Sequence, residues 1–256
     1  MQAVKGWKHW HDYFRQRAGR PLPELDLATD YSALPDSLAD SLAVFQLGES
    51  GGGTVITQAR VSRLPGVDAD YAGAIEYFVA EEHRHANILA MCVRMLGGCL
   101  RRSNWTARLF VIGRRMMGLR LKVLVLLAAE VVGICYYRAI ASALPASPLR
   151  TWLMQIVDDE RAHLEFHCAF LRSQLRGPLH RAVFMAAWRS VMVVAAVVVM
   201  LDHRRTIRDL GLGFRRSWHR WMAIGALAEQ LVTGPAGQSG AGRPGDSATR
   251  ARASSG

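Results

Sequence analysis

Two Glu-x-x-His pairs lie in stretches of helical periodicity, Glu82/His85 and Glu160/His163. Residues three apart on an α-helix share a face, so the glutamate and the histidine of each pair can contact one metal ion together. Each pair follows a glutamate that has apolar neighbours in the sequence. These two further glutamates are Glu49 and Glu130. Four carboxylates and two imidazoles are the donor set with which a helical bundle holds two iron or manganese ions.

Glu130 is the most informative member of this set. It is the only acidic residue between His83 and Val157, and apolar residues surround it from Val123 to Val132. A carboxylate that is buried without a partner is strongly destabilising. We therefore expect Glu130 to be protonated, ion-paired or bound to metal.

The intervals between the four glutamates fit a bundle. They are 33 residues from Glu49 to Glu82, 48 from Glu82 to Glu130 and 30 from Glu130 to Glu160. At about 1.5 Å per residue, roughly 30 residues make one helix, a turn and one returning helix, which brings the chain back to the same level. The longer middle interval is a crossover between two helical hairpins. Two divalent ions would cancel the charge of the four carboxylates, and such an oxygen-rich set with imidazole suits iron or manganese rather than a closed zinc site.

The apolar pattern and the capping residues predict helices that position these carboxylates. The expected helices cover about residues 37–64, 69–96, 105–143, 148–176, 179–209 and 214–232. Three glycines, 51–53, follow Glu49 after one serine, Ser50, and cost about 2–3 kcal/mol relative to alanine inside a helix. The first helix is therefore kinked or kept thin beside the metal, or the glycines form a plain loop.

The helices divide the chain into four expected parts. They are an N-terminal arm with a short helix (1–36), a helical bundle (37–175), a C-terminal helical extension (176–233) and a disordered tail (234–256). The tail is rich in Gly, Ser, Ala and Arg, which bury too little apolar surface to fold. His9 and His11 of the arm are expected at the surface, because no third metal ligand is near them.

Composition limits the class of protein. The chain of 256 residues is 50% hydrophobic and can bury one large core. Its net charge of +11 favours acidic partners such as anionic lipid, nucleic acid or an acidic carrier. No signal peptide is expected, since Trp7, His9 and Arg15 interrupt any apolar segment, and the scattered cysteines are expected as buried thiols in a reducing cytoplasm. These cysteines are Cys92, Cys99, Cys135 and Cys168.

Residues 37–175 resemble the ferritin-like di-iron carboxylate superfamily. The Glu-Glu-x-Arg-His motif of acyl-carrier-protein desaturases and rubrerythrins is matched by residues 81–85, Glu-Glu-His-Arg-His. Their second motif, Asp-Glu-x-x-His, is matched by residues 159–163, with Ala162 where an arginine is frequent. The resemblance implies an all-α fold, a ferritin-like four-helix bundle with a long crossover, to which the predicted helices after residue 175 add a C-terminal extension. It also implies that the metal ligands are Glu49, Glu82, His85, Glu130, Glu160 and His163.

Four further residues are candidates for supporting roles. The resemblance implies that Asp159 accepts a hydrogen bond that fixes a histidine tautomer. His167, one turn after His163, is either a seventh ligand, as in some N-oxygenases, or a supporting or core histidine. Tyr137 either gates electrons or donates to bound oxygen, or it packs in the core. Glu81 is expected either to face solvent or to contact a metal ligand without binding the metal itself.

We expect a non-haem di-iron oxidoreductase with two iron ions, manganese or a mixed centre being the alternative. It would use O2 to hydroxylate, desaturate or N-oxygenate a small organic or carrier-bound substrate. Electrons would come from an external donor, since the sequence has no flavin or rubredoxin motif. The alternatives are a rubrerythrin-like protein that scavenges peroxide or handles iron, and a scaffold protein that holds no metal. The substrate cannot be read from the sequence, because pocket residues in such bundles follow no short motif.

Residues 182–201 have the length and apolar character of a membrane span, but Arg189 interrupts them. We expect a helix packed across the bundle or the face of a homodimer. The alternative is a monotopic anchor on the cytoplasmic face of a membrane, with arginines up to residue 216 on anionic lipid. These arginines are Arg204, Arg205, Arg215 and Arg216. Nucleic acid is not expected as a partner, because nothing matches a nucleic-acid-binding fold.

Overall fold

The fold is all-helical in the part of the chain that the computed structural model describes, residues 6–26, 28–51, 53–104 and 117–234. Within these ranges there is no strand, as the sequence predicts. The helices are α1 (Trp7–Ala18), α2 (Asp36–Glu49), α3 (Gly53–Val61), α4 (Ala69–Met95), α6 (Leu119–Ala143), α7 (Pro148–Gln174), α8 (Pro178–Asp202), α9 (Arg204–Asp209) and α10 (Phe214–Thr233).

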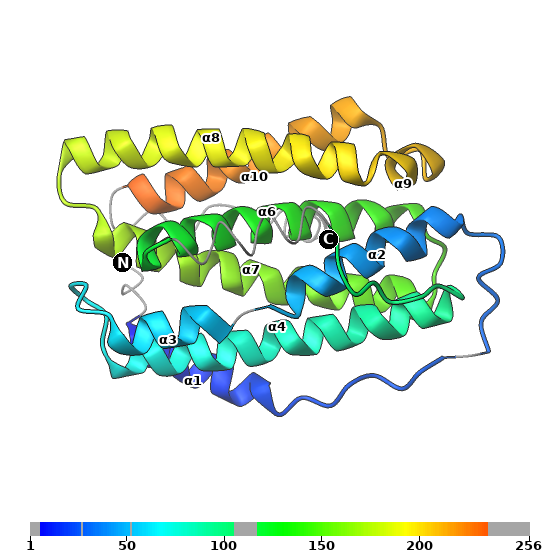
Figure 1. Cartoon of the computed structure of the whole chain (residues 1–256), viewed down its shortest axis with the longest axis horizontal. Helices are drawn as coiled ribbons and strands as arrows, with labels where there is room; N and C mark the ends of the chain where they lie inside the picture. The colour runs from blue at the N-terminus through cyan, green and yellow to red at the C-terminus, as the bar shows by residue number, and fades with distance from the viewer. Residues whose placement is uncertain (1–5, 27, 52, 105–116, 235–256) are drawn as a thin grey trace, which may run out of the picture.

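The helices are arranged in layers (Figure 1). The middle layer is the pair α6 and α7, which pack against each other along their length. On one side α4 lies against α7 and carries α1, α2 and α3 on its surface. On the other side α8 and α10 cover the middle layer, α8 against α6 and α10 against both α6 and α7. The centre of the protein is therefore enclosed by α2, α4, α6 and α7.

The first predicted helix of the bundle is interrupted. Instead of running from residue 37 to 64, it forms α2, which ends at Glu49, and α3, which begins at Gly53. Ser50 closes α2, since its backbone N–H donates to Gln46 O at 3.2 Å and its hydroxyl donates to Leu47 O at 2.8 Å. The interruption agrees with the alternative in which the glycines form a loop, except that Gly53 already belongs to α3. Glu49 is consequently the last residue of its helix.

The two helices that carry the Glu-x-x-His pairs begin where their caps predict. Asp68 accepts a 2.8 Å hydrogen bond from Tyr71 N at the start of α4. At the start of α7, Ser147 Oγ accepts a hydrogen bond from Arg150 N at 3.3 Å, and Pro148 occupies the first turn. The N–H groups of the first turn of a helix have no partner within the helix. A proline, which has no N–H, therefore costs the helix no hydrogen bond at this position. Both helices have 27 residues, so the two pairs are held on rigid elements of equal length.

Two other predicted helices differ from the structure. α6 begins at Leu119, and Met117 and Gly118 are not helical, while residues 105–116 of the predicted helix lie outside the described residues. The predicted helix 179–209 is interrupted at His203, which separates α8 from α9. The side chain of His203 turns inward, where its Nδ1 lies 2.8 Å from Ser41 Oγ. The predicted tail also lies outside the described residues from position 235 onward.

The predicted N-terminal arm is packed onto the bundle through α1. Trp10 and Phe14 are 2% and 1% exposed, and the Phe14 ring stands edge-on to Phe166 of α7 at 5.2 Å between centroids. His9 is exposed and His11 is half-buried, with a side-chain exposure of 25%. α1 therefore buries one aromatic face against α4 and α7 and leaves these two histidines at the edge.

Two helices, α6 and α8, are long and apolar enough to cross a membrane by length and composition alone. Their surroundings differ, because 78% of the apolar window of α6 is buried within the protein and only 22% of that of α8. α6 is thus a core helix. The cysteines are all free thiols: Cys92, Cys135 and Cys168 are buried, but Cys99 is exposed, contrary to the prediction, because it follows the end of α4.

Candidate metal centre

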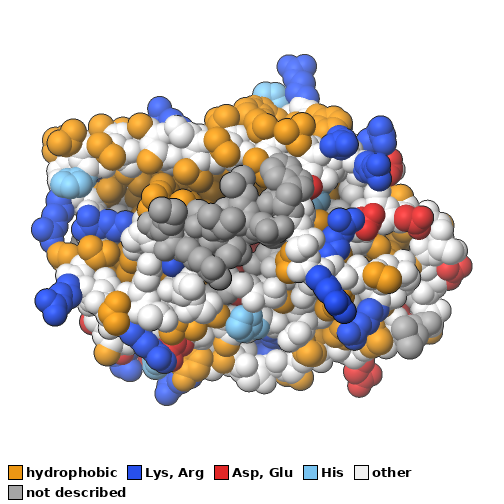
Figure 2. Space-filling view, in the orientation of Figure 1, with side chains coloured by type: hydrophobic (Ala, Val, Ile, Leu, Met, Phe, Trp, Pro, Cys, Tyr) orange, Lys and Arg blue, Asp and Glu red, His pale blue; other side chains and the backbone are white. Residues whose placement is uncertain are grey.

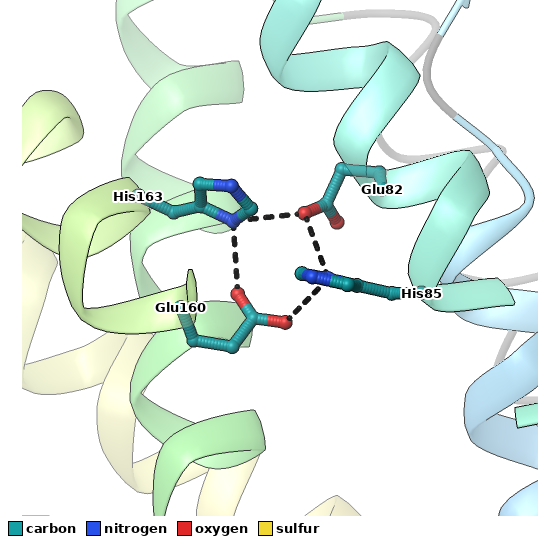
Figure 3. A group of neighbouring side chains, drawn as sticks. All are labelled: Glu82, His85, Glu160 and His163. Carbon is teal, nitrogen blue, oxygen red and sulfur yellow. Dashed lines mark hydrogen bonds and ion pairs between the residues drawn. The ribbon is translucent and has the colours of Figure 1, made fainter. Parts of the chain in front are cut away.

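The two Glu-x-x-His pairs meet in the middle of the bundle (Figure 3). His163 Nδ1 lies 2.9 Å from Glu82 Oε1 and 3.1 Å from Glu160 Oε2. His85 Nδ1 lies 3.2 Å from Glu160 Oε1 and 3.7 Å from Glu82 Oε1. One ligand atom of each residue lies within 4.8 Å of the others, so these four side chains could hold a metal ion. Each glutamate faces both histidines, which makes the group reciprocal between α4 and α7.

Glu130 and Glu49 lie next to this group. Glu130, on α6, is 4% exposed, and its Oε2 lies 3.8 Å from His163 Nδ1. It also interacts with Glu160, while Glu49 interacts with Glu82. Glu49 lies at the end of α2, and its Oε1 accepts a 2.7 Å hydrogen bond from the hydroxyl of Tyr137. The structure therefore groups four of the six predicted ligands closely enough to hold a metal ion and places Glu130 and Glu49 beside them.

Burial and mutual repulsion perturb the carboxylates. Burial, and then the charges of Glu160 and Glu82, raise the pKa of Glu130 well above its usual range, and the same causes raise the pKa of Glu49. Burial also opposes ionisation of Glu160, but hydrogen bonds from Glu130, His163 and His85 hold its pKa well below the usual range. Protons thus occupy some of these groups when no cation is bound, and a divalent ion would displace them.

Several buried polar atoms in the centre have polar neighbours nearby but no hydrogen bond of good geometry among the described residues. They include Glu82 Oε1, His85 Nδ1 and both ring nitrogens of His167. Buried polar groups are nearly always paired, so such a set at one place needs an explanation. A bound cation would satisfy the glutamate oxygen and the histidine nitrogen that face the group. The donor chemistry therefore fits a metal.

The outer nitrogens of both histidines face carboxylates from the opposite motif. His163 Nε2 lies 3.0 Å from Glu81 Oε2, and His85 Nε2 lies 3.3 Å from Asp159 Oδ2. Glu81 is 2% exposed, because it faces His163 rather than solvent. Although burial raises the pKa of Glu81, its hydrogen bond with His163 and nearby positive charges lower it to about 2. Both outer carboxylates can therefore orient a histidine with its Nδ1 toward the centre.

Two arginines of the N-terminal segment complete this outer layer. Arg17 Nε donates to Glu81 Oε1 at 3.0 Å, and another Arg17 nitrogen donates to Asp159 Oδ1. Arg20 donates to Asp159 Oδ2 at 2.9 Å and also to Glu81. The guanidinium groups bridge the two carboxylates and offset their charge. The sequence did not predict that Arg17 and Arg20 bind these carboxylates. The only signal in the sequence is that two basic residues stand three positions apart at the end of a helix.

His167 and Tyr137 lie beside the outer glutamates rather than in the central group. His167 Nε2 is 3.3 Å from Glu130 Oε1, and burial followed by repulsion from His163 lowers its pKa to about 3. It is therefore a neutral imidazole, able to donate to Glu130 or to bind a cation. Burial and the charge of Glu49 raise the pKa of Tyr137 well above its usual range, so its hydroxyl stays protonated and donates.

Protein-family models, curated proteins and solved structures were compared with this chain, and none of them matches it. The class of the site therefore follows from its residues alone. It is a buried cluster of histidines and carboxylates, able to hold a metal ion, inside a helical protein.

Proposed function

We propose that the chain is a ferritin-like di-iron protein that uses O2 to oxidise an organic substrate. The observation that carries the proposal is the reciprocal group of Glu82, His85, Glu160 and His163. Two motifs on two helices supply one histidine and one glutamate each, and each histidine is supported by the other motif. Such a set, with the neighbouring Glu49 and Glu130, provides six ligands for two ions.

The proposed ligands divide into three kinds. Glu82 and Glu160 lie between both histidines and are the proposed bridging carboxylates. His85 and His163 would hold the metal through Nδ1, because their Nε2 atoms face Asp159 and Glu81. Glu49 and Glu130 are the proposed terminal carboxylates. Four carboxylates and two neutral imidazoles balance two divalent ions, and the same set accepts manganese or a mixed centre.

The metal centre, when bound, supplies the redox chemistry and the template on which O2 and substrate meet. The residues of this chain prepare its environment. Phe78 stands edge-on to both His163 and His167 at 4.8 Å between centroids, and Phe14 lies 5.6 Å from His163, so aromatic rings exclude water on this side. Tyr137 holds Glu49 in place and keeps a proton at its hydroxyl oxygen.

The partners proposed for this reaction are a small organic or carrier-bound substrate and an external electron donor. The class of reaction is hydroxylation, desaturation or N-oxygenation. Substrate-dependent O2 consumption by the reduced, iron-loaded protein would support this class. Turnover of peroxide without any organic substrate would instead support a rubrerythrin-like or iron-handling protein.

Metal analysis of the full chain tests the site. We expect two iron ions per chain after anaerobic loading, and an optical change when O2 is admitted to the reduced protein. Glu130→Ala should lose at least one ion, because it removes a buried terminal ligand. Glu165→Ala is the matched control, since Glu165 is an exposed glutamate on α7. Two tightly bound ions in Glu130→Ala would show that the site assignment is wrong.

A further inference from the structure

α8 presents a continuous apolar stripe to solvent. The exposed fractions are 74% for Leu179, 61% for Val183, 43% for Val193, 61% for Val194, 43% for Val197 and 54% for Leu201. These residues recur at helical spacing, and Ala186 and Ser190, which are uncharged and exposed, fill the interval between them. At about 1.5 Å per residue the stripe is roughly 33 Å long. Figure 2 shows hydrophobic side chains along the upper edge of the molecule, where Figure 1 places α8.

The opposite face of α8 is fixed to the protein. Phe184, Trp188 and Met192 are 7%, 1% and 2% exposed, and Trp188 Nε1 donates to Gly225 O of α10 at 2.9 Å. A Cβ on Gly225 would lie 3.3 Å from the Met192 methyl carbon, so the two helices are in close contact there. α8 is therefore a docked helix with one free face.

Positive charge surrounds this free face. Residues 176–233 contain nine arginines and three acidic residues, a net charge of +6. Exposed arginines stand before and within the first turns of α8, and others follow its last residue. They are Arg176, Arg181, Arg204, Arg205, Arg208, Arg215 and Arg216. Lys and Arg side chains protrude at the upper edge of Figure 2 beside the apolar stripe.

The acidic residues of this region are engaged with the protein itself. Glu229 accepts two hydrogen bonds from Arg189, at 2.9 and 2.7 Å. Asp209 accepts one from Ser37 at 2.7 Å, and Asp202 accepts one from Asn104 at 2.9 Å. A partner that binds the stripe therefore meets mainly basic groups at its rim.

We infer that the apolar stripe of α8 and its flanking arginines form a surface that binds an anionic lipid membrane. The helix lies in the plane of the interface, with the stripe in the outer acyl region and the arginines at lipid phosphates. This inference is independent of the metal centre and of its proposed reaction. It also explains why only 22% of the 18-residue apolar window of α8 is buried within the protein.

The charges favour binding to a membrane surface over two alternatives, contact with a second copy of the chain and a membrane-spanning α8. A second copy of the chain, in either direction, would bring basic ends of α8 together, because arginines stand at both ends. A membrane crossing is disfavoured, because α10 lies along α8 and carries the exposed Arg215, Arg216 and Arg220, which would enter the hydrocarbon. An anionic surface meets both the apolar stripe and the flanking charge.

Cosedimentation of the full chain with lipid vesicles tests the inference. We expect binding to vesicles of phosphatidylcholine and phosphatidylglycerol, weaker binding to phosphatidylcholine alone, and a decrease with salt. Val183→Glu/Val194→Glu should lower the partition coefficient by about tenfold or more, since it places two charges in the acyl region. Arg204→Gln/Arg205→Gln should lower it by about fivefold per arginine.

Each double variant has a matched control of the same chemistry away from α8. Leu22→Glu/Val61→Glu changes two apolar residues that are 45% and 73% exposed, and Arg63→Gln/Arg94→Gln removes two exposed arginines. Both controls should bind vesicles as the wild type does. Circular dichroism should show the same helix content in all variants, because every substituted side chain is exposed.

Two results would overturn the inference. Equal loss of binding in the variants and in their controls would mean that the net charge of the whole chain, and not α8, attracts the vesicles. A dimer in sedimentation equilibrium that Val183→Glu/Val194→Glu dissociates, together with no vesicle binding by the wild type, would assign the stripe to a second copy of the chain.

Discussion

The hydroxyl of Tyr137 donates a 2.7 Å hydrogen bond to Glu49 Oε1, which joins two residues 88 positions apart in the chain. Tyr137 lies seven residues after Glu130 on α6, and Glu49 ends α2. A glutamate on the last residue of a helix, followed by glycines, would have little local support. The tyrosine supplies that support from the neighbouring helix.

Tyr137→Phe should therefore loosen Glu49. The variant leaves a buried carboxylate oxygen without its donor, and the free energy of unfolding should fall by about 1–3 kcal/mol. Affinity for one of the two proposed metal ions should fall with it, because Glu49 is a proposed terminal ligand. Denaturant unfolding measures the first effect, and metal titration measures the second.

Tyr136→Phe separates the two effects. Tyr136 is also buried, but its hydroxyl lies 2.7 Å from Ser41 Oγ and has no contact with the metal group. This variant should lose a similar amount of stability and keep its affinity for both proposed metal ions. Equal metal affinity in the two variants would count against Glu49 as a ligand.

Arg17 and Arg20 should matter for metal binding although neither contacts the central group. Arg17→Met/Arg20→Met removes the guanidinium partners of the buried Glu81 and leaves Asp159 with Arg84 at 3.8 Å, which should destabilise the fold by about 3 kcal/mol. Metal affinity should fall by about 10- to 100-fold, the usual effect of removing an outer partner of a metal ligand. Calorimetry with ferrous ion measures it.

Arg15→Met is the control on the same helix. Its side chain is 57% exposed and lies 3.3 Å from Asp12 at the surface. Stability and metal affinity should stay close to those of the wild type, since exposed ion pairs contribute about 0–1 kcal/mol. If all three arginines behave alike, the bridging contacts have no special role.

The sequence predicts those parts of the site that depend on local geometry. The Glu82/His85 and Glu160/His163 pairs are three residues apart on a helix, so their common face follows from the helix itself. The start of α7 at Pro148 is likewise local. Metal binding by these residues stays a prediction, as do the substrate and the electron donor.

Other parts of the site and fold depend on contacts between segments far apart in the chain, and no local sequence pattern predicts these contacts. Arg17 reaches Glu81 across 64 residues and Asp159 across 142. The glycines after Glu49 allow either a kink or a loop, and in the structure the helix is interrupted there, with α2 and α3 each packed against α4. The exposure of α8 is of the same kind, because an apolar stretch has the same sequence in a core and at an interface.

Gly98 should be intolerant of a side chain. A Cβ at this position would lie 2.6 Å from Ala39 Cβ and 3.2 Å from Val93 Cγ1, so α2 and the end of α4 would have to separate. Gly98→Ala should lower the free energy of unfolding by about 1–3 kcal/mol. Gly48→Ala is the control. Gly48 lies on α2, and a Cβ there would meet nothing within 4 Å, so this substitution should raise the free energy of unfolding by about 0.5–1 kcal/mol. Thermal unfolding of both variants measures the difference.

His203 should make stability depend on acidity. Burial lowers its pKa to about 4 from 6.5, and its neighbours include Asp202, which opposes the shift, and Arg101, which favours it. Its neutral ring holds Ser41, which in turn contacts Tyr136. The unfolded chain therefore binds a proton that the folded chain does not bind between pH 6.5 and 4.

The sign of the effect follows from this difference. The contribution of His203 is complete above pH 6.5 and is lost as the pH falls toward 4. Relative to His203→Asn, the wild type should lose about 1.4 kcal/mol of stability per pH unit in this range. Urea unfolding of both proteins at several pH values measures the slope, and nuclear magnetic resonance of the His203 ring checks that it stays neutral. A difference that does not change with pH would show that the ring titrates alike in the folded and unfolded chain.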